Sequence, residues 1–285
     1  MSGSAPEGGG AADPDALPEP GVLFVPDAGT WTPTRLARGP WDPGACHGGA
    51  PAALIARELE LLDAPVEMRL ARITIELLRP VPLVPLTLTA EVVRPGAKVG
   101  LLEATLSRAD DRQVLARARA LRIRAVEVDF DDGVDERPPS RPEDLRPAAP
   151  REMSPTGGND YEAYHNIAVE HRWAVGRFGE PGPAWDWIRL RVPVVPGESP
   201  SGWQRAMAAA DFANGISAVA PFDGTSLFIN PDLTVHLWRE PVGEWIGMEA
   251  VTRTSTSGIG TSDSAMWDVD GRIGRGAQSL LLDRL

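Results

Sequence analysis

The sequence predicts an α+β fold of two tandem units, each with a curved antiparallel sheet wrapped around one central helix. The chain of 285 residues holds 29 glycines and 28 prolines, more turn-forming residues than a mostly helical protein tolerates. An internal repeat at an offset near 160 residues divides the chain into two similar segments. In each segment one apolar helix precedes four long strands, an order that gives an antiparallel sheet closing over a helix.

The repeat rests on three pairs of matching segments. These are ITIELLR (73–79) with LTVHLWR (233–239), LTLTAEV (86–92) with IGMEAVT (246–252), and DRQVLARARALRI (111–123) with DGRIGRGAQSLLL (270–282). Chance likeness between strands rich in Val, Leu, Thr and Arg is the alternative explanation. The nearly constant offset favours two copies of one unit.

Composition sets the borders of the units. Residues 1–20 contain almost no large apolar side chains, so burial cannot offset the entropy of ordering them, and we expect a disordered tail. Residues 126–160 combine dense acids with repeated prolines, which is typical of an interdomain linker. We therefore expect the N-terminal unit over 21–125 and the C-terminal unit over 161–285.

Hydrophobic periodicity places the elements of both units. A helix is expected over 49–62, GAPAALIARELELL, with leucines and alanines on one face, and its counterpart over 203–218. The Asp270-Gly271 pair is a strong hairpin signal. Strands of the C-terminal unit are expected over 224–240, 243–255, 258–268 and 272–284.

The net charge and the cysteine content exclude several classes of function. The net charge of -12 and the pI near 4.9 argue against nucleic acid as a partner, because phosphate binding needs a cationic face. The single Cys46 can form neither an internal disulfide nor a thiolate zinc site, which favours a reducing cytoplasm. No uninterrupted apolar span is present, and the four histidines lack metal-ligand spacing. We expect no membrane, metal or cofactor.

Three polar residues of the C-terminal unit are candidates for chemistry. Asp211 is an acid within an alanine-rich apolar helix, a place that a carboxylate avoids unless it faces solvent or has a task. Gln278 stands where we align Arg119 of the first unit, which indicates specialisation or simply an outward-facing strand residue. Asn230, directly before Pro231, is either a site residue or an ordinary turn residue.

The N-terminal unit contributes the segment WDPGACHGGAP, in which His47, Gly48 and Gly49 directly precede the predicted helix. A glycine-rich helix N-terminus presents backbone N–H groups that can hold a carbonyl oxygen as it gains negative charge. These three residues are the substrate-binding candidates. His47 is equally consistent with an acid or base and with a capping residue, whereas Cys46 fits a small packed side chain better than a nucleophile.

Together these segments resemble a known family. The segments AADFANG, NPDLTVHLWREPVGEWIGMEAVT and GIGTSDSAMWDVDGRIGRGAQSLLL, with CHGGAPAALIARELE and ITIELLRPVP in the first unit, resemble the TesB-like (type II) acyl-CoA thioesterases of the double hotdog superfamily. The resemblance covers about residues 21–125 and 160–285. It implies a hotdog fold in each unit, hydrolysis of acyl-CoA to free acid and CoA, and a homodimer of double hotdogs.

The resemblance also implies a site. In that family a helix aspartate, a Ser or Thr near the first long strand and a glutamine on the last strand position a water beside the thioester. Here these positions are Asp211, Asn230 and Gln278, and Asn230 departs from the family pattern. An amide can also orient water through its donor and acceptor. The water would lose a proton to Asp211, while Arg239 and Arg253 are candidates for contact with CoA phosphates.

Two alternatives stay open at this point. One is a hotdog hydratase or dehydratase of acyl-CoA, which needs an aspartate and a histidine close together on a hotdog helix or its preceding loop. Hydration of an enoyl-CoA would identify it. The other is a non-catalytic acyl-CoA-binding protein that has lost its hydroxyl residue, for which tight binding without product would be diagnostic.

Overall fold

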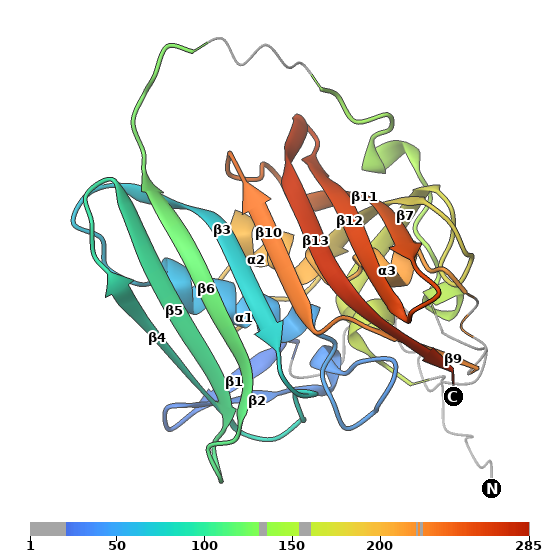
Figure 1. The fold of residues 1–285 in the computed structure, drawn as a ribbon, viewed down its shortest axis with the longest axis horizontal. Helices are drawn as coiled ribbons and strands as arrows, with labels where there is room; N and C mark the ends of the chain where they lie inside the picture. Colours follow the sequence, from blue (N-terminus) through green and yellow to red (C-terminus); the bar gives the residue numbers. More distant parts are fainter. Residues whose placement is uncertain (1–20, 131–135, 154–160, 221, 223–224, 285) are drawn as a thin grey trace, which may run out of the picture.

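A computed structural model of the chain describes residues 21–130, 136–153, 161–220, 222 and 225–284. The tail predicted over 1–20 lies outside these residues. Within the described part, the strands form one 13-stranded antiparallel sheet in the order β1-β2-β4-β5-β6-β3-β10-β13-β12-β11-β8-β7, with β9 paired to β13 (Figure 1). The predicted sheets of the two units are therefore joined into one.

The N-terminal unit follows its prediction closely. Its helix is α1 (Gly49–Glu60), against an expected range of 49–62. A short hairpin precedes α1 and four long strands follow it. The strands are β1 (Phe24–Asp27), β2 (Thr30–Pro33), β3 (Met68–Leu77), β4 (Leu86–Arg94), β5 (Val99–Arg108) and β6 (Val114–Arg124).

The C-terminal unit differs from its prediction at two places. The single helix expected over 203–218 is broken into α2 (Gly202–Ala210) and α3 (Ala213–Ile216), and the strand expected over 224–240 is divided at Asn230-Pro231. Proline lacks the N–H that a continuous strand would use. The strands are β7 (Val169–Val175), β8 (Ala184–Leu190), β9 (Ser226–Ile229), β10 (Asp232–Leu237), β11 (Trp245–Thr254), β12 (Ile259–Asp268) and β13 (Gly271–Arg284).

The two units meet where β3 pairs with β10. Thr74 lies directly opposite Thr234, the residue 160 positions later, and their hydroxyl oxygens are 3.1 Å apart. Equivalent residues face each other in this way only on a local two-fold axis. The repeat found in the sequence is therefore a two-fold symmetry of the fold, with its axis through the β3–β10 seam.

The register corrects one sequence alignment. Thr74 pairs with Arg119 on β6, whereas Thr234 pairs with Ala277 on β13, so Arg119 corresponds to Ala277 and not to Gln278. The counterpart of Gln278 is Ala120, and both are buried. The offset falls from 160 between β5 and β12 to 158 between β6 and β13, because the β5–β6 turn is two residues longer than the β12–β13 turn. The two copies still differ at this inward-facing position.

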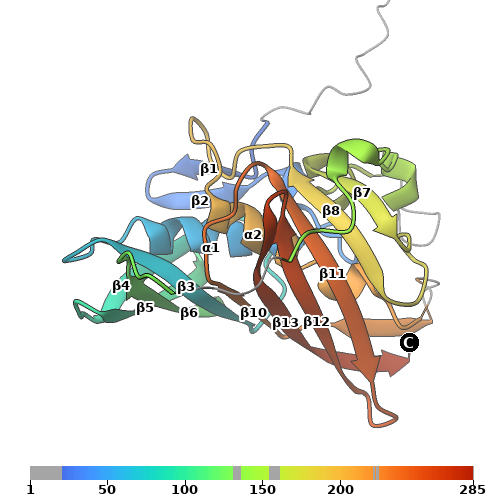
Figure 2. The ribbon, with the colours of Figure 1, turned by 90° about the horizontal axis from the view of Figure 1, so that it is seen from above.

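Helices α1 and α2 lie side by side on the concave side of the sheet, with β1 and β2 on their far side (Figure 2). Small side chains allow this approach. A Cβ atom at Gly49 would lie 2.5 Å from the carbonyl oxygen of Ala208, so glycine is required at this crossing. The contact brings the N-terminus of α1 beside the C-terminus of α2.

The described part of the predicted linker packs against the C-terminal unit. It contains two short 3₁₀ helices, Pro142–Asp144 and Pro150–Met153. Ala148 N–H donates to the carbonyl of His171 on β7, and the Arg172 guanidinium donates to the carbonyl of Pro142. No helix in the described residues is long and apolar enough to cross a membrane.

We expect Asp268→Asn to destabilise the fold by about 3–5 kcal/mol, because it breaks a buried ion pair. The Asp268 side chain is fully buried and accepts from the Arg239 guanidinium and from three backbone N–H groups. Urea unfolding measures the change. Asp263→Asn, which affects an exposed carboxylate paired loosely with Arg253, is the matched control and should cost less than about 1 kcal/mol. Equal midpoints for both variants would contradict the expectation.

Candidate active site

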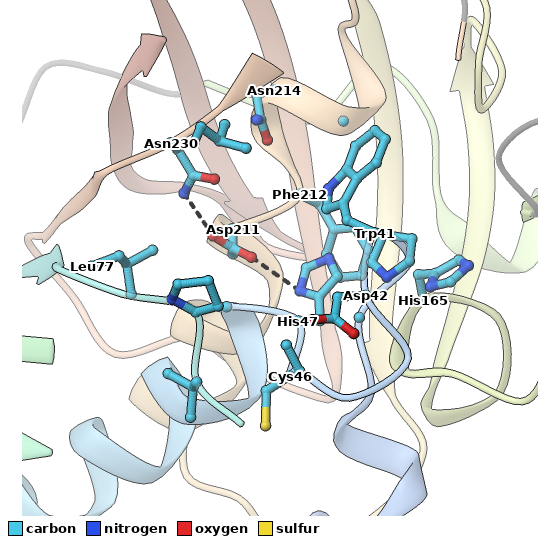
Figure 3. Close-up of a pocket in the computed structure, with 18 of the residues that line it drawn as sticks. Trp41, Asp42, Cys46, His47, Leu77, His165, Asp211, Phe212, Asn214 and Asn230 are labelled. Carbon is cyan, nitrogen blue, oxygen red and sulfur yellow. Dashed lines mark hydrogen bonds and ion pairs between the residues drawn. The ribbon is translucent and has the colours of Figure 1, made fainter. Parts of the chain in front are cut away.

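A cavity of about 450 Å³ lies between the two units. The N-terminal unit lines it with the loop before α1 and the segment after β3, and the C-terminal unit lines it with the helix break and the β9–β10 turn. Asp211, Asn230 and His47 converge on one another at its wall (Figure 3). The site therefore requires both units.

The Asp211 carboxylate is the centre of this arrangement. Asp211 directly follows α2 and is 7% exposed. Its Oδ1 accepts a hydrogen bond of 2.8 Å from the Asn230 side-chain amide, and its Oδ2 lies 3.0 Å from Nδ1 of His47. A backbone hydrogen bond from Gly49 also reaches the carboxylate. Three donors thus surround a buried acid.

These donors determine the charge of Asp211. Burial by itself raises the pKa of a carboxyl group, but the hydrogen bond and charge of His47, the amide of Asn230 and the N–H of Gly49 outweigh it. The pKa of Asp211 therefore lies below its ordinary value of 3.8. The group is an anion throughout the neutral range.

His47 is held rigidly beside this anion. Its ring packs against both Tyr164 and Phe212, with centroid distances of 4.8 and 4.4 Å. Nδ1 lies 3.0 Å from the Asp211 carboxylate and 3.1 Å from the nitrogen of Gly49. Because a carboxylate only accepts, Nδ1 carries the proton and donates to Asp211, which leaves the Gly49 N–H for the same carboxylate.

Gln278 lies behind the site and does not line the cavity. Its Oε1 accepts from the backbone N–H of Asn214 at 3.1 Å, and its Nε2 donates to the carbonyl of Asp211 at 3.3 Å. In a continuous helix both backbone groups would bond within the helix. The Gln278 amide replaces those bonds at the break between α2 and α3, and so fixes the backbone that carries Asp211.

The structure thus separates the candidate residues into two groups. Asp211, Asn230, His47 and Gly48 line the cavity, and the backbone N–H of Gly49 donates to the Asp211 carboxylate. Arg239 and Arg253 do not line it; Arg239 is paired with buried Asp268. Cys46 also lines the cavity, and burial raises the pKa of its thiol, so the nucleophilic thiolate is suppressed.

Sequence reasoning missed the contribution of the segment after the linker. Tyr164 and His165 belong to a π-helical turn, Tyr164–Ala168, whose irregular pattern carries no periodic signal. Tyr164 positions His47, while His165 lines the cavity with no hydrogen-bond partner in the described part of the chain. Burial, then the charges of His47 and His171, lower the pKa of His165 to about 3, so it is neutral.

The two-fold axis generates a second hollow, but not a second site. It is lined by Leu237 and Trp238, the counterparts of Leu77 and Leu78 in the first cavity. Its counterpart of Asn230 is Leu70. No aspartate or histidine is among the described residues that line it. Only one of the two symmetry-related hollows therefore holds the polar cluster.

No three His, Cys, Asp or Glu side chains gather closely enough to hold a metal ion within the described ranges. We derive the chemistry of the cluster from Asp211, His47 and Asn230. A buried anion held by fixed donors beside an apolar cavity is suited to accept a proton from a water molecule or to stabilise a cation.

Comparisons with known proteins show the family of this chain. The sequence matches the family model of the acyl-CoA thioesterase N-terminal domain over residues 37–123 and that of the C-terminal domain over residues 142–282. The chain belongs to the acyl-CoA thioesterase family. The C-terminal match begins within the segment that composition predicts to be the linker. No curated protein sequence matches the chain.

Solved structures share the fold of this thioesterase. A protein of unknown function with a hot dog fold from Alicyclobacillus acidocaldarius has 13% identity and a TM-score of 0.69, with 91% of this chain and 95% of that chain covered. The acyl-CoA thioesterase II TesB2 of Mycobacterium marinum has 14% identity and a TM-score of 0.58, with 95% and 97% covered. The double hotdog fold predicted from the sequence is confirmed.

Proposed function

We propose that this thioesterase hydrolyses acyl-CoA with a water molecule activated by Asp211. The observation that carries the proposal is the buried Asp211 carboxylate, kept ionised by His47 and Asn230 at the wall of a largely apolar cavity. The acyl thioester lies in this cavity with its carbonyl carbon beside the carboxylate. Both units line the cavity, so in this proposal hydrolysis requires the two hotdog units together in one chain.

In the proposed reaction Asp211 accepts a proton as the oxygen of water attacks the thioester carbonyl. The C–S bond then breaks, and the proton passes to the sulfur, which leaves as the CoA thiol. The carbonyl oxygen gains negative charge near the N-terminus of α1, where the helix dipole favours an anion. The products are a free acid and CoA.

The other candidate residues act on Asp211. Asn230 donates to one carboxylate oxygen and His47 contacts the other, so the carboxylate has a fixed orientation. The hydroxyl expected from the family pattern is thereby replaced by an amide that can donate to Asp211 and still accept from water. Gln278 holds the backbone of Asp211 and is in this proposal a positioning residue.

Release of the CoA thiol from a panel of acyl-CoA substrates, followed with a thiol reagent, tests the proposed function. The His47–Asp211 pair also matches what the hydratase alternative requires, so an enoyl-CoA is included and loss of its conjugated absorbance is recorded. Hydrolysis without hydration supports the proposal. Hydration without thiol release, or acyl-CoA binding without product, would overturn it.

We expect Asn230→Leu, which installs the residue found at the two-fold related position, to move the acid limb of kcat/KM to higher pH. The wild-type limb that reports Asp211 lies below its ordinary pKa of 3.8, because Asn230 is among the groups that lower it. Removing one hydrogen-bond donor destabilises the anionic form of Asp211 and so raises its pKa. Activity is therefore lost at a higher pH as the pH falls. A pH profile measures the shift. An unchanged limb would exclude Asn230 from the support of Asp211.

The remaining expectations from the sequence stay predictions. These are the homodimer of double hotdogs, the cytoplasmic location, the absence of a nucleic-acid or membrane partner and the division of the chain at 21–125, 126–160 and 161–285. Light scattering of the purified chain tests the dimer. A mass equal to one chain of 30.5 kDa would exclude it.

A further inference from the structure

Comparison of the two symmetry-related units identifies a pair of equivalent arginines, of which one forms an ion pair and the other does not. Arg79 and Arg239 are equivalent, since each lies five residues after the paired threonines Thr74 and Thr234. The adjacent backbone is equivalent as well: Leu78 donates to the carbonyl of the β6 residue Leu115, as Trp238 donates to the corresponding residue of β13. Their surroundings can therefore be compared directly.

In the C-terminal unit this arginine has a structural role. Arg239 donates from both terminal nitrogens to the carboxylate of Asp268, at the end of β12. The carboxylate is fully buried and also accepts from backbone N–H groups of the following turn. The charge of the guanidinium is thus neutralised within the unit, and both of its terminal nitrogens are engaged.

In the N-terminal unit the partner carboxylate is absent. The register of β4 on β5, compared with that of β11 on β12, places Arg108 where the C-terminal unit has Asp268. Arg108 is itself paired with Asp110. Arg79 is exposed, and no described carboxylate forms an ion pair with it. An arginine that is neutralised in one copy carries an uncompensated charge in the other.

This uncompensated arginine lies at the active cavity. Arg79 lines the cavity together with Leu78 and Pro80, which are also exposed, so this segment forms part of its solvent-facing rim. Among the described residues that line the cavity, Arg79 carries the one guanidinium or ammonium group. Asp211 and the aromatic rings of Phe212 and Phe228 lie at the buried part. The cavity is thus cationic at one point of its rim.

We propose that Arg79 binds a phosphate group of CoA; this rests on the proposed function, because it assigns the rim of the same cavity. CoA carries its phosphates at the far end of the pantetheine arm, so they stay near solvent when the thioester reaches Asp211. A guanidinium binds phosphate oxygens through two N–H groups. The chain has a net charge of -12 and therefore repels an anionic substrate such as CoA. The positive charge of Arg79 at the rim of the cavity offsets this repulsion locally.

The test compares one acyl group on two carriers, acyl-CoA and the phosphate-free acyl-pantetheine. For the wild type, kcat/KM is expected to be about tenfold higher for acyl-CoA, the usual effect of one charged hydrogen-bonded contact. In Arg79→Ala this ratio falls to about one, and Arg79→Lys restores part of it. Added salt lowers the wild-type ratio because it screens an exposed charge, and leaves the Arg79→Ala ratio unchanged.

Arg253→Ala is the matched control, since Arg253 is similarly exposed, does not line the cavity and is expected to keep the wild-type ratio. A wild-type ratio near one, or a wild-type ratio in Arg79→Ala, overturns the assignment of Arg79 while leaving hydrolysis intact. Failure of the wild type to cleave either carrier overturns the proposed function instead. The two failures are therefore distinguishable.

Discussion

Asp211→Asn is expected to lower kcat for acyl-CoA hydrolysis by about 10²–10⁴-fold, the usual contribution of a general base. The replacement has the same size and shape but cannot accept a proton from water. It also removes the charge that His47 faces at 3.0 Å. Thiol release under saturating substrate measures the loss, and turnover at the wild-type rate would exclude Asp211 as the base.

A matched variant keeps this experiment interpretable. Asp263→Asn makes the same chemical change at an exposed position on β12 that is remote from the cavity lining, and it should leave kcat unchanged. Acyl-CoA binding by Asp211→Asn, measured by calorimetry, separates lost chemistry from lost binding. Retained binding with lost turnover is the expected pair of results.

The fold could be predicted because the sequence contains two copies of one structural unit. The pairing of Thr74 with Thr234 shows that the repeat offset of 160 is a structural two-fold, and strands β11 to β13 begin and end within two residues of their expected limits. Alternation of apolar and polar residues is a local property, which the sequence carries directly. The joining of the two sheets depends on a contact between units and could not be derived in this way.

The break after α2 could not be predicted for a different reason. The residues from Trp203 to Ala218 have an apolar helical pattern, and local propensity favours one continuous helix. The break depends on Gln278, which lies 67 residues after Asp211 and bonds to the backbone of the break from the last strand. A tertiary contact overrides the local preference. The break releases Asp211 from the helix and lets it face the cavity.

The composition of the site could be predicted only in part. The sequence predicts Asp211 and Asn230 together as catalytic residues of the C-terminal unit, but it predicts His47 of the N-terminal unit only as a substrate-binding residue. Their contact depends on the crossing of α1 and α2, where Gly49 approaches Ala208. Arg79 illustrates the same limit, since the repeat aligns it with Arg239 but only the structure shows which of the two is paired.

Gly48→Ala is expected to lower kcat/KM by at least about 10²-fold, because small displacements of catalytic groups have effects of this size. An ideal Cβ at Gly48 lies 2.7, 2.8 and 2.9 Å from the two oxygens and the Cγ of the Asp211 carboxylate. The backbone of Gly48 is already helical, with φ −60° and ψ −26°, so alanine causes no backbone strain. The clash must therefore be relieved by the carboxylate itself, which leaves its contacts with His47 and Asn230.

Because the clash involves only one side chain, Gly48→Ala is expected to have a limited effect on the stability of the protein. Overpacking at one side chain costs about 1–3 kcal/mol, which thermal unfolding of Gly48→Ala measures alongside its kinetics. Gly21→Ala is the matched control, since a Cβ at Gly21 meets no atom within 4 Å and should change neither quantity. Loss of activity in a folded Gly48→Ala protein would show that the position of Asp211, and not merely its presence, sets the rate. Wild-type kinetics in this variant would mean that the carboxylate works equally well when displaced, and would contradict the proposed geometry.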